Sequence, residues 1–232
     1  MTLRSLLLIA VSTATLAGAQ AAQAATNLLT NGGFDDIGAG AVPEGWGGLT
    51  YYTDGTHPGH VALPGWTVEA GSVDLTSTSS GWGPADMGPY SLDINGWSAG
   101  TISQQFATVA GQTYNVSYAF SRNEAGSPND PVQATVAAGG VSRLISVSYE
   151  DPSFGSIGHM LWHHGGFSFV GDGNEATIRL AAVTDSNAGV FFDTVSVTGG
   201  VPEPAAWALM IVGFGGVGAV LRSRRRAAPA TA

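Results

Sequence analysis

A five-residue segment matches the pattern of a serine nucleophile. Gly96-Trp97-Ser98-Ala99-Gly100 spells G-x-S-x-G, and an aspartate followed by a histidine, for example Asp130 and His159, lies downstream. In a hydrolase this serine stands on a sharp turn between a strand and a helix. The residues from 101 to 108 alternate like a strand instead, so Asn95-Gly96 predicts a hairpin turn. A secreted hydrolase is therefore the least favoured function.

Histidine is the second residue type here that could do chemistry, because neutral imidazole is a common ligand of zinc and copper. In a strand, His159 and His163 would share a face but stand about 13 Å apart, too far to chelate one ion. A pair between His163 and His57 or His60 stays open, whereas exposed polar positions, including His164, are the favoured interpretation. With 0 Cys, a Cys-ligated zinc site and a disulfide are excluded.

The aromatic residues suggest a third kind of chemistry, the stacking of sugar rings. The chain has 6 Trp and 6 Tyr but only 11% charged residues, and sugar sites combine aromatic faces with few polar contacts. Trp66 and Trp162 lie in strand-like segments, where we expect them in the core. The ligand-binding candidates lie in loops or at strand ends, and packing within those loops is the alternative: Trp46, Tyr51, Tyr52, Trp82, Tyr90 and Trp97, with Trp82 and Trp97 first because each lies in a Gly-rich turn.

The charge of the chain excludes one class of ligand. The 8 basic residues are all arginine and stand against 17 acidic residues. Five arginines lie near the two ends, so residues 26–200 hold three arginines and sixteen carboxylates, a net charge of −13. Nucleic-acid affinity depends on basic side chains that displace counterions, so nucleic-acid binding is excluded. The same charge favours a neutral polysaccharide over an anionic one.

Short alternating segments predict an all-β body with no amphipathic helix. Tyr114, Val116 and Tyr118 share one face of a strand, with polar or small residues between them. Residues 35–63 and 121–131 resist assignment and are interpreted as insertions. The strands expected number about eleven, enough for two packed sheets: 27–34, 65–70, 72–76, 90–95, 102–106, 114–120, 132–138, 141–149, 159–170, 175–183 and 189–198.

The last expected strand changes phase. Val190 and Phe192 share one parity, whereas Val195 and Val197 share the other. Because a strand has a side-chain period of two, both pairs face the core only if one residue is inserted between them. We therefore expect a β-bulge at Asp193-Thr194.

The first 24 residues have the features of a secretory signal peptide. Arg4 supplies a positive charge, residues 6–17 form an apolar run, and Ala22-Gln23-Ala24 has the pattern of a cleavage site. Cleavage after Ala24 is the main prediction, and cleavage after Ala21 is the alternative. The apolar run is short for a retained membrane anchor.

The other end of the chain predicts a membrane-spanning helix. Residues 205–221 are uncharged and would form a helix of about 25 Å, just enough for a thin bilayer. The Arg-rich tail at 222–226 predicts a cytoplasmic flank, with the body outside. Residues 213–218 also spell G-x-G-x-x-G, but no acidic residue follows as a dinucleotide-binding turn requires. Close helix packing is the favoured role of these glycines.

The segment before this helix completes a recognisable pattern. Pro202-Glu203-Pro204, then Trp207, the apolar run and the arginines resemble the PEP-CTERM sorting signal in its PEPxxWA variant. The resemblance implies a Gram-negative bacterium whose exosortase, a membrane cysteine protease, recognises the motif and removes the tail. The prolines hold the chain extended around Glu203, which suits a protease site.

Blocks across the body resemble a second family, choice-of-anchor C. This family is similar to plant cell-wall proteins of a domain-of-unknown-function class with a galactose-binding-like jelly roll. The resemblance implies that fold and an association with polysaccharide. The blocks run in order along the chain: 27–35, 65–68, 71–74, 91–96, 101–106, 109–114, 162, 167–169 and 192–197.

The resemblance also implies a metal site. Related carbohydrate-binding jelly rolls hold a structural Ca²⁺ near the first and last strands, where Asp35 and Asp193 fall in this sequence. Calcium takes six to eight oxygen ligands, including backbone carbonyls that a bulge can orient. Two solvated aspartates are the alternative.

These features predict three parts: a signal peptide (1–24), a jelly-roll β-sandwich (25–200) and a sorting signal (201–232). We expect an exported, non-enzymatic protein that is membrane-anchored until exosortase processing and then lies at the cell surface or outside the cell. There it would bind, or be embedded in, exopolysaccharide. The alternative is a surface structural protein with no specific ligand.

Overall fold

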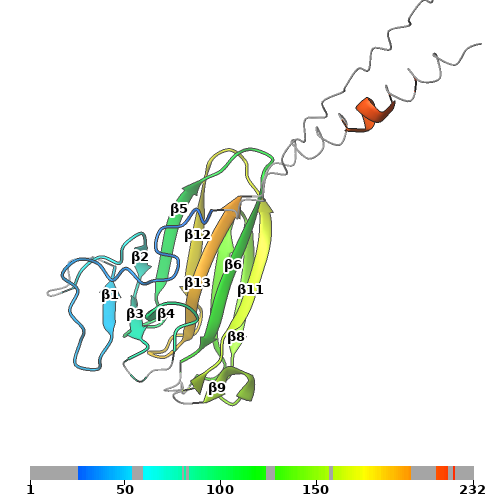
Figure 1. Ribbon diagram of the computed structural model, residues 1–232. Coiled ribbons are helices and arrows are strands. Elements are labelled where there is room, and N and C mark those ends of the chain that lie inside the picture. Colours follow the sequence, from blue (N-terminus) through cyan, green and yellow to red (C-terminus); the bar gives the residue numbers. More distant parts are fainter. Residues whose placement is uncertain are drawn as a thin grey trace, which may run out of the picture.

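A computed structural model describes residues 26–53, 60–79, 81, 84–123, 129–156, 159–199, 213–218 and 222. Between residues 26 and 199 the chain forms two antiparallel sheets that pack face to face (Figure 1). The predicted signal peptide, the sorting motif Pro202-Glu203-Pro204 with Trp207, and Trp82 lie outside the described residues.

The two sheets contain six and five strands. The six-stranded sheet has the order β1 (Leu49–Tyr52), β3 (Ser72–Ser77), β4 (Tyr90–Asp93), β13 (Val190–Gly199), β6 (Thr113–Arg122) and β11 (His163–Val170). The five-stranded sheet has the order β2 (Thr67–Ala70), β5 (Thr101–Ala107), β12 (Glu175–Ala182), β7 (Val132–Ala138) and β8 (Val141–Val147).

The connectivity confirms the expected jelly roll. From β4 the chain crosses to β5 in the other sheet, returns to β6, and crosses again to the hairpin β7–β8. It then passes through β11, β12 and β13, changing sheet each time. Two interlocked Greek keys of this kind define a jelly roll. The link from β8 to β11 holds a short 3₁₀ helix η1 (Pro152–Phe154) and the strands β9 (Gly155–Ser156) and β10 (His159–Met160).

The core lies between the sheets and follows the two-residue period of the strands. Ile102, Ile178 and Leu180 enter it from the five-stranded sheet, opposite Leu75, Leu92 and Phe192 from the six-stranded one. Trp66 is buried as expected, and its indole N–H donates to the carbonyl of Asn31 at 3.0 Å. Trp162 was expected in the core, but it is only half-buried and lies between β10 and β11, where its indole N–H donates to the carbonyl of Pro84 at 2.9 Å.

Two segments near the start of the body differ from the prediction. Residues 27–34 do not form a strand, because Asn31 and Phe34 adopt positive φ angles of 53° and 59° and the segment turns; it meets β13 through a bridge between Asn27 and Thr198. The segment 35–63, interpreted as an insertion, contributes the edge strand β1. Within β1 Tyr51 is only 1% exposed, and its hydroxyl donates to the carbonyl of Ile37 at 2.8 Å, so this ring is not a surface aromatic.

The predicted bulge in the last strand is confirmed. The pairing of β13 with β6 shifts register between Asp193 and Ser196, and Thr194 has a φ of +50°. The extra residue turns Val195 and Val197 toward the core that Val190 and Phe192 already face. The amide of Val195 donates to the carbonyl of Gly32 at 2.8 Å, so the bulge also holds the segment before β1.

The described part of the C-terminal region is helical. Residues 213–218, which spell G-x-G-x-x-G, are all helical, so they do not form the strand-to-helix turn of a dinucleotide site. In the part of the chain that the structure describes, no helix has the length and apolar character needed to cross a membrane.

Candidate functional site

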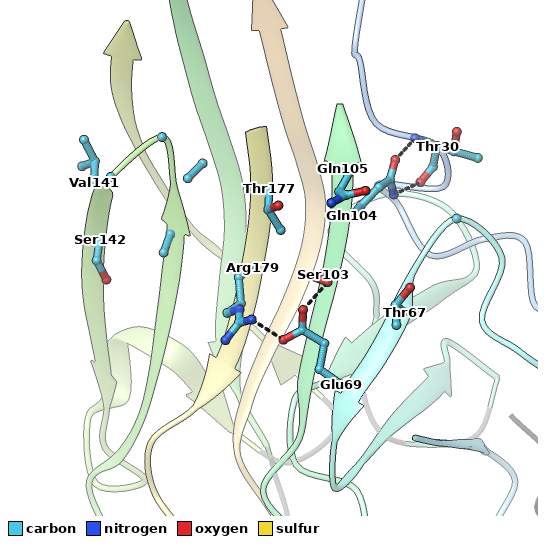
Figure 2. A pocket seen from close by; sticks show the side chains of 15 residues that line it. Thr30, Thr67, Glu69, Ser103, Gln104, Gln105, Val141, Ser142, Thr177 and Arg179 are labelled. Atoms are coloured by element: carbon cyan, nitrogen blue, oxygen red, sulfur yellow. Dashed lines mark hydrogen bonds and ion pairs between the residues drawn. The ribbon is translucent and has the colours of Figure 1, made fainter. Parts of the chain in front are cut away.

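The outer face of the five-stranded sheet carries an open hollow of about 900 Å³, here called the main hollow (Figure 2). Its floor contains a row of residues that pair in register across all five strands. Along this row lie Thr67, Ser103, Arg179, Ala137 and Ser142. With neighbouring strands about 4.8 Å apart, the row is roughly 19 Å long.

The sequence builds this floor by alternation. In β5, Ile102 and Phe106 enter the core, so Ser103 and Gln105 face outward. In β12, Ile178 and Leu180 are buried, and Thr177 and Arg179 face the hollow in the same way. Small residues on β7 and in the following turn, Ala137, Gly139 and Gly140, leave the space above the floor open.

One ion pair supplies the charged groups of the main hollow. A terminal nitrogen of Arg179 lies 2.6 Å from Oε2 of Glu69, and the hydroxyl of Ser103 donates to Oε1 of Glu69 at 2.6 Å (Figure 2). Each carboxylate oxygen therefore has a partner, and each partner comes from a different strand. The Arg179 side chain remains about half exposed (54%), so part of its guanidinium faces solvent in the hollow.

At one end of the main hollow, the Gln104 side chain makes two hydrogen bonds to the backbone of Thr30, as a neighbouring strand would. The Gln104 amide accepts from the backbone N–H of Thr30 at 2.6 Å and donates to the carbonyl of the same residue at 2.9 Å (Figure 2). The backbone N–H and carbonyl of Thr30 thus both have hydrogen-bond partners, although the residue is not paired in a sheet. The segment before β1 is thereby attached to β5 and forms part of the rim.

A second hollow of about 480 Å³ adjoins the main one. The two share Gly139, Gly140 and Thr177, and the second continues past Phe169 toward Asp172 and Glu175. Gly139 has a φ of +55°, and a Cβ there would collide with the Phe169 ring, so only glycine fits where the hollows meet. Together the two hollows form one surface depression, called the groove below.

The aromatic ligand candidates lie elsewhere. Trp97 is 63% exposed in the loop between β4 and β5, and Tyr90 packs partly against the core. The indole N–H of Trp46 donates to Glu44 at 3.0 Å. None of these three rings lines either hollow. The polar lining of the main hollow consists of hydroxyl and amide side chains and one ion pair, among small and apolar residues. Sequence patterns identify these polar side chains as outward-facing but not as a site.

The two predicted metal ligands are brought together at the bulge. A Cβ at Gly33 would lie 3.6 Å from Oδ2 of Asp35 and 3.9 Å from Oδ1 of Asp193, so the two carboxylates flank this glycine. Asp193 is completely buried and accepts backbone hydrogen bonds from Met87 at 3.0 Å and Thr194 at 2.6 Å. Burial raises the pKa of Asp193 to about 7, and the nearby carboxylates of Asp86 and Asp35 add to the rise.

The fit to a metal ion is partial. Two carboxylates and a bent backbone are present, but among the described residues no group of three or more His, Cys, Asp or Glu side chains could hold a metal. A calcium ion at Gly33 would take its remaining oxygens from the backbone and water. Three of the four described histidines contact protein groups: His164 contacts Asp86 at 3.2 Å, His163 the Ser153 carbonyl at 3.0 Å, and His60 the Thr50 carbonyl at 2.9 Å.

The G-x-S-x-G segment has no hydrolase geometry. Ser98 lies in the loop that connects β4 in one sheet to β5 in the other, so the segment is followed by a strand, as expected. The strands β4 and β5 do not pair with each other, but an antiparallel bridge between Asn95 and Ala99 forms a tight turn at the predicted position. Asp130, a candidate triad residue, accepts hydrogen bonds from the hydroxyl of Ser148 at 2.6 Å and the amide of Tyr149 at 2.7 Å.

The family of the chain follows from its sequence. A family model described as "Protein of unknown function (DUF642)" matches residues 27–198, which include both sheets and the groove. The chain belongs to the DUF642 family. Comparison of this DUF642 chain with curated protein sequences gives no match.

Solved structures with a similar arrangement of strands include carbohydrate-binding modules. TmCBM61 in complex with beta-1,4-galactotriose is 16% identical, with 74% of the DUF642 chain and 97% of that chain covered and a TM-score of 0.44. A family 35 carbohydrate-binding module from Clostridium thermocellum is 13% identical, with 65% and 96% covered and a TM-score of 0.40. The CBM22-1 xylan-binding domain from Paenibacillus barcinonensis Xyn10C is 13% identical, with 58% and 85% covered and a TM-score of 0.38.

The DUF642 domain also holds one buried and one partly buried acid side by side, away from the groove. Asp74 of β3 and Asp93 of β4 are direct cross-strand partners on the outer side of the six-stranded sheet. Burial raises the pKa of Asp74 to about 7, with a further rise from Glu44. Burial also raises the pKa of Asp93 well above its usual value, although Asn95 and Asn123 donate hydrogen bonds to it.

The stability of the domain should therefore fall as the pH rises from about 4 to about 7. In this range the folded protein keeps a proton on Asp74 that the unfolded chain has lost. The stability that comes from this raised pKa is therefore fully present below pH 4 and lost above pH 7. The loss from Asp74 is on the order of a few kcal/mol. Urea unfolding between pH 4 and pH 8 should show a smaller decrease for Asp74→Asn, and an unchanged decrease for the exposed control Asp185→Asn. Equal slopes for Asp74→Asn and the parent would contradict the assignment.

Proposed function

We propose that this DUF642 protein is a non-catalytic polysaccharide-binding protein of the cell envelope or extracellular matrix, and that the groove is its binding site. One observation carries the proposal: a large open hollow lies on a rigid sheet and is lined by hydroxyl and amide groups. Sugar hydroxyls both donate and accept hydrogen bonds. The side chains of Gln105 and Thr177 can do both, whereas the Ser103 hydroxyl, which donates to Glu69, can accept.

The shape of the groove favours a chain over a single sugar. The main hollow follows a row of residues that crosses five strands, and the second hollow extends from it along β12, past Thr177 toward Glu175 and Asp172. On the β7 side of the main hollow the lining residues Ala137, Gly139 and Gly140 are small and leave space above the sheet. A polymer can therefore lie along the groove with several units in contact.

The chemistry of the main hollow favours binding over hydrolysis. Glycoside hydrolysis uses two carboxyl groups that flank the scissile bond. Among the residues that line the main hollow, Glu69 is the single carboxylate, and both of its oxygens are held by Arg179 and Ser103. A surface structural protein with no specific ligand is the second candidate, favoured because the buried Phe169 is the one aromatic side chain among the described residues that line the two hollows.

Export and sorting belong to the same proposal. The proposed route is secretion with a signal peptide (1–24), transient anchoring by the helix at 205–221, and cleavage by an exosortase at Pro202-Glu203-Pro204, which leaves the body associated with exopolysaccharide. The support for this route comes from the sequence patterns at the two ends.

A structural Ca²⁺ at the bulge is proposed as well. Asp35 and Asp193 flank Gly33, and the pKa of Asp193 is raised by burial and by neighbouring carboxylates, an arrangement that a bound cation would relieve. Calcium supplies positive charge and accepts several oxygen ligands. At this position it would join the segment before β1 to β13, and it takes no part in ligand binding.

If the groove binds polysaccharide, alanine substitutions of two glutamines on the same face of the same sheet should affect binding differently. Gln105→Ala removes a donor and an acceptor from the main hollow and should weaken retention by the bound polysaccharide about fivefold, since a net hydrogen bond is worth about 1 kcal/mol. Gln133→Ala, on β7 outside both hollows, should leave retention unchanged. Affinity electrophoresis against a panel of soluble polysaccharides measures both. If no polysaccharide retards the parent protein, the structural alternative is correct.

The proposed calcium site predicts a cation-dependent melting temperature. Saturation at about 100 times the dissociation constant stabilises the native state by about 2.7 kcal/mol. Melting should therefore occur several degrees lower in EGTA than in calcium, and Asp35→Asn or Asp193→Asn should abolish the difference. Glu150→Gln, which alters an exposed acid in the turn after β8, should retain it. The same melting curve in calcium and in EGTA would disprove the site.

The proposed sorting predicts a defined C-terminus on the exported protein. Mass spectrometry of the surface-exposed form should find a chain that ends near Pro202-Glu203-Pro204. Neutral replacements of Arg222, Arg224, Arg225 and Arg226 should reduce processing, because they remove the charges that hold the tail in the cytoplasm. An exported protein that still ends at Ala232 would contradict the proposal.

A further inference from the structure

The groove contains few charged side chains, and the negative ones outnumber the positive one. In the main hollow, Glu69 and Arg179 form a close ion pair with no net charge. The second hollow adds Asp172 and Glu175 and no basic residue. Asp172 is ionised at neutral pH, because hydrogen bonds from Asn174 lower its pKa. A polymer that lies along the groove therefore meets three carboxylates and one guanidinium.

The position of Glu69 decides what Arg179 can do. An unpaired arginine in an open hollow would bind a carboxylate or sulfate through two parallel hydrogen bonds. Here Glu69 already occupies that side of the guanidinium at 2.6 Å, and Ser103 holds the carboxylate in place from a third strand. An acidic sugar approaching Arg179 must compete with a carboxylate that is fixed and hydrogen-bonded.

We propose that the groove selects uncharged polysaccharide chains over acidic ones, and that Glu69 is the residue that sets this selectivity by neutralising Arg179. The inference depends on the proposed function, since it specifies the ligand class of the same site. The carboxylates of Asp172 and Glu175 add the same preference for uncharged chains in the second hollow. Acidic chains are rejected by repulsion from these groups, and neutral chains use the exposed face of Arg179 as a hydrogen-bond donor.

The expected size of the effect follows from Coulomb's law. One unit charge about 4 Å away contributes about 1 kcal/mol in water and more near a protein surface. Removal of the Glu69 charge should therefore raise the affinity for an acidic chain, relative to a neutral one, by about fivefold or more. Because exposed charges are screened beyond about 10 Å at 0.1 M salt and beyond about 3 Å at 1 M, the selectivity should shrink at high ionic strength.

The test uses pairs of polymers that differ in charge alone. Polygalacturonate is compared with the same polymer after carboxyl reduction, and a β-glucan is compared with its C6-oxidised form. Affinity electrophoresis of the full exported protein should give a neutral-to-acidic affinity ratio of at least ten. Glu69→Gln keeps an acceptor for Ser103 and should lower this ratio about fivefold. Asp172→Asn combined with Glu175→Gln is a second variant, away from the ion pair, and should lower it as well.

The matched control is Glu150→Gln, which removes one negative charge from an exposed turn outside the groove and should leave the ratio unchanged. A parent protein that binds neutral and acidic chains equally would overturn the inference and leave the proposed function intact. A parent protein that binds no polymer would overturn the proposed function itself. If Glu69→Gln and Glu150→Gln shift the ratio by the same amount, overall charge and not Glu69 sets the selectivity.

Discussion

The pairing of β13 with β6 is the constraint around which the rest of this domain is arranged. These ten-residue strands are interior strands of the six-stranded sheet, and both must face the core along their whole length. The sequence of β13 makes this impossible without one inserted residue, because its buried valines change parity. The β-bulge at Thr194 supplies this extra residue, and it leaves Asp193 buried beside Gly33. A packing requirement in one strand thereby places a buried carboxylate close to two others, Asp35 and Asp86.

The two sheets use their outer faces differently. The six-stranded sheet buries acids under loops, and the raised pKa values of Asp74 and Asp193 show that these acids reduce stability near neutral pH. The five-stranded sheet leaves its outer face open and lined by uncharged polar groups around a single ion pair. Polar side chains on a strand face are stabilised by water when nothing is bound. Such a face can therefore stay exposed without a hydrophobic patch and still offer hydrogen bonds to a ligand.

Alternation along single strands predicted much of the fold but not the groove. The sequence separates Ile102 and Phe106 from Ser103 and Gln105, so the inner and outer faces of β5 are predictable from local pattern. The row from Thr67 to Ser142 depends on the register of five strands, and register between segments far apart in the chain has no local signal. Local pattern also failed where backbone conformation overrides it. Residues 27–34 were predicted as a strand, yet left-handed turns at Asn31 and Phe34 break the segment.

The bridge between Asn27 and Thr198 places the beginning and the end of the folded domain side by side. The Asn27 side chain strengthens this contact, because its amide donates to the carbonyl of Val195 and its oxygen accepts from the amide of Val197. Domains whose ends meet tolerate circular permutation and insertion into other chains. The DUF642 fold can thus be joined through both ends at one pole without disturbing the strands between them. A force applied through both ends would load this bridge first, ahead of the long β13–β6 ladder.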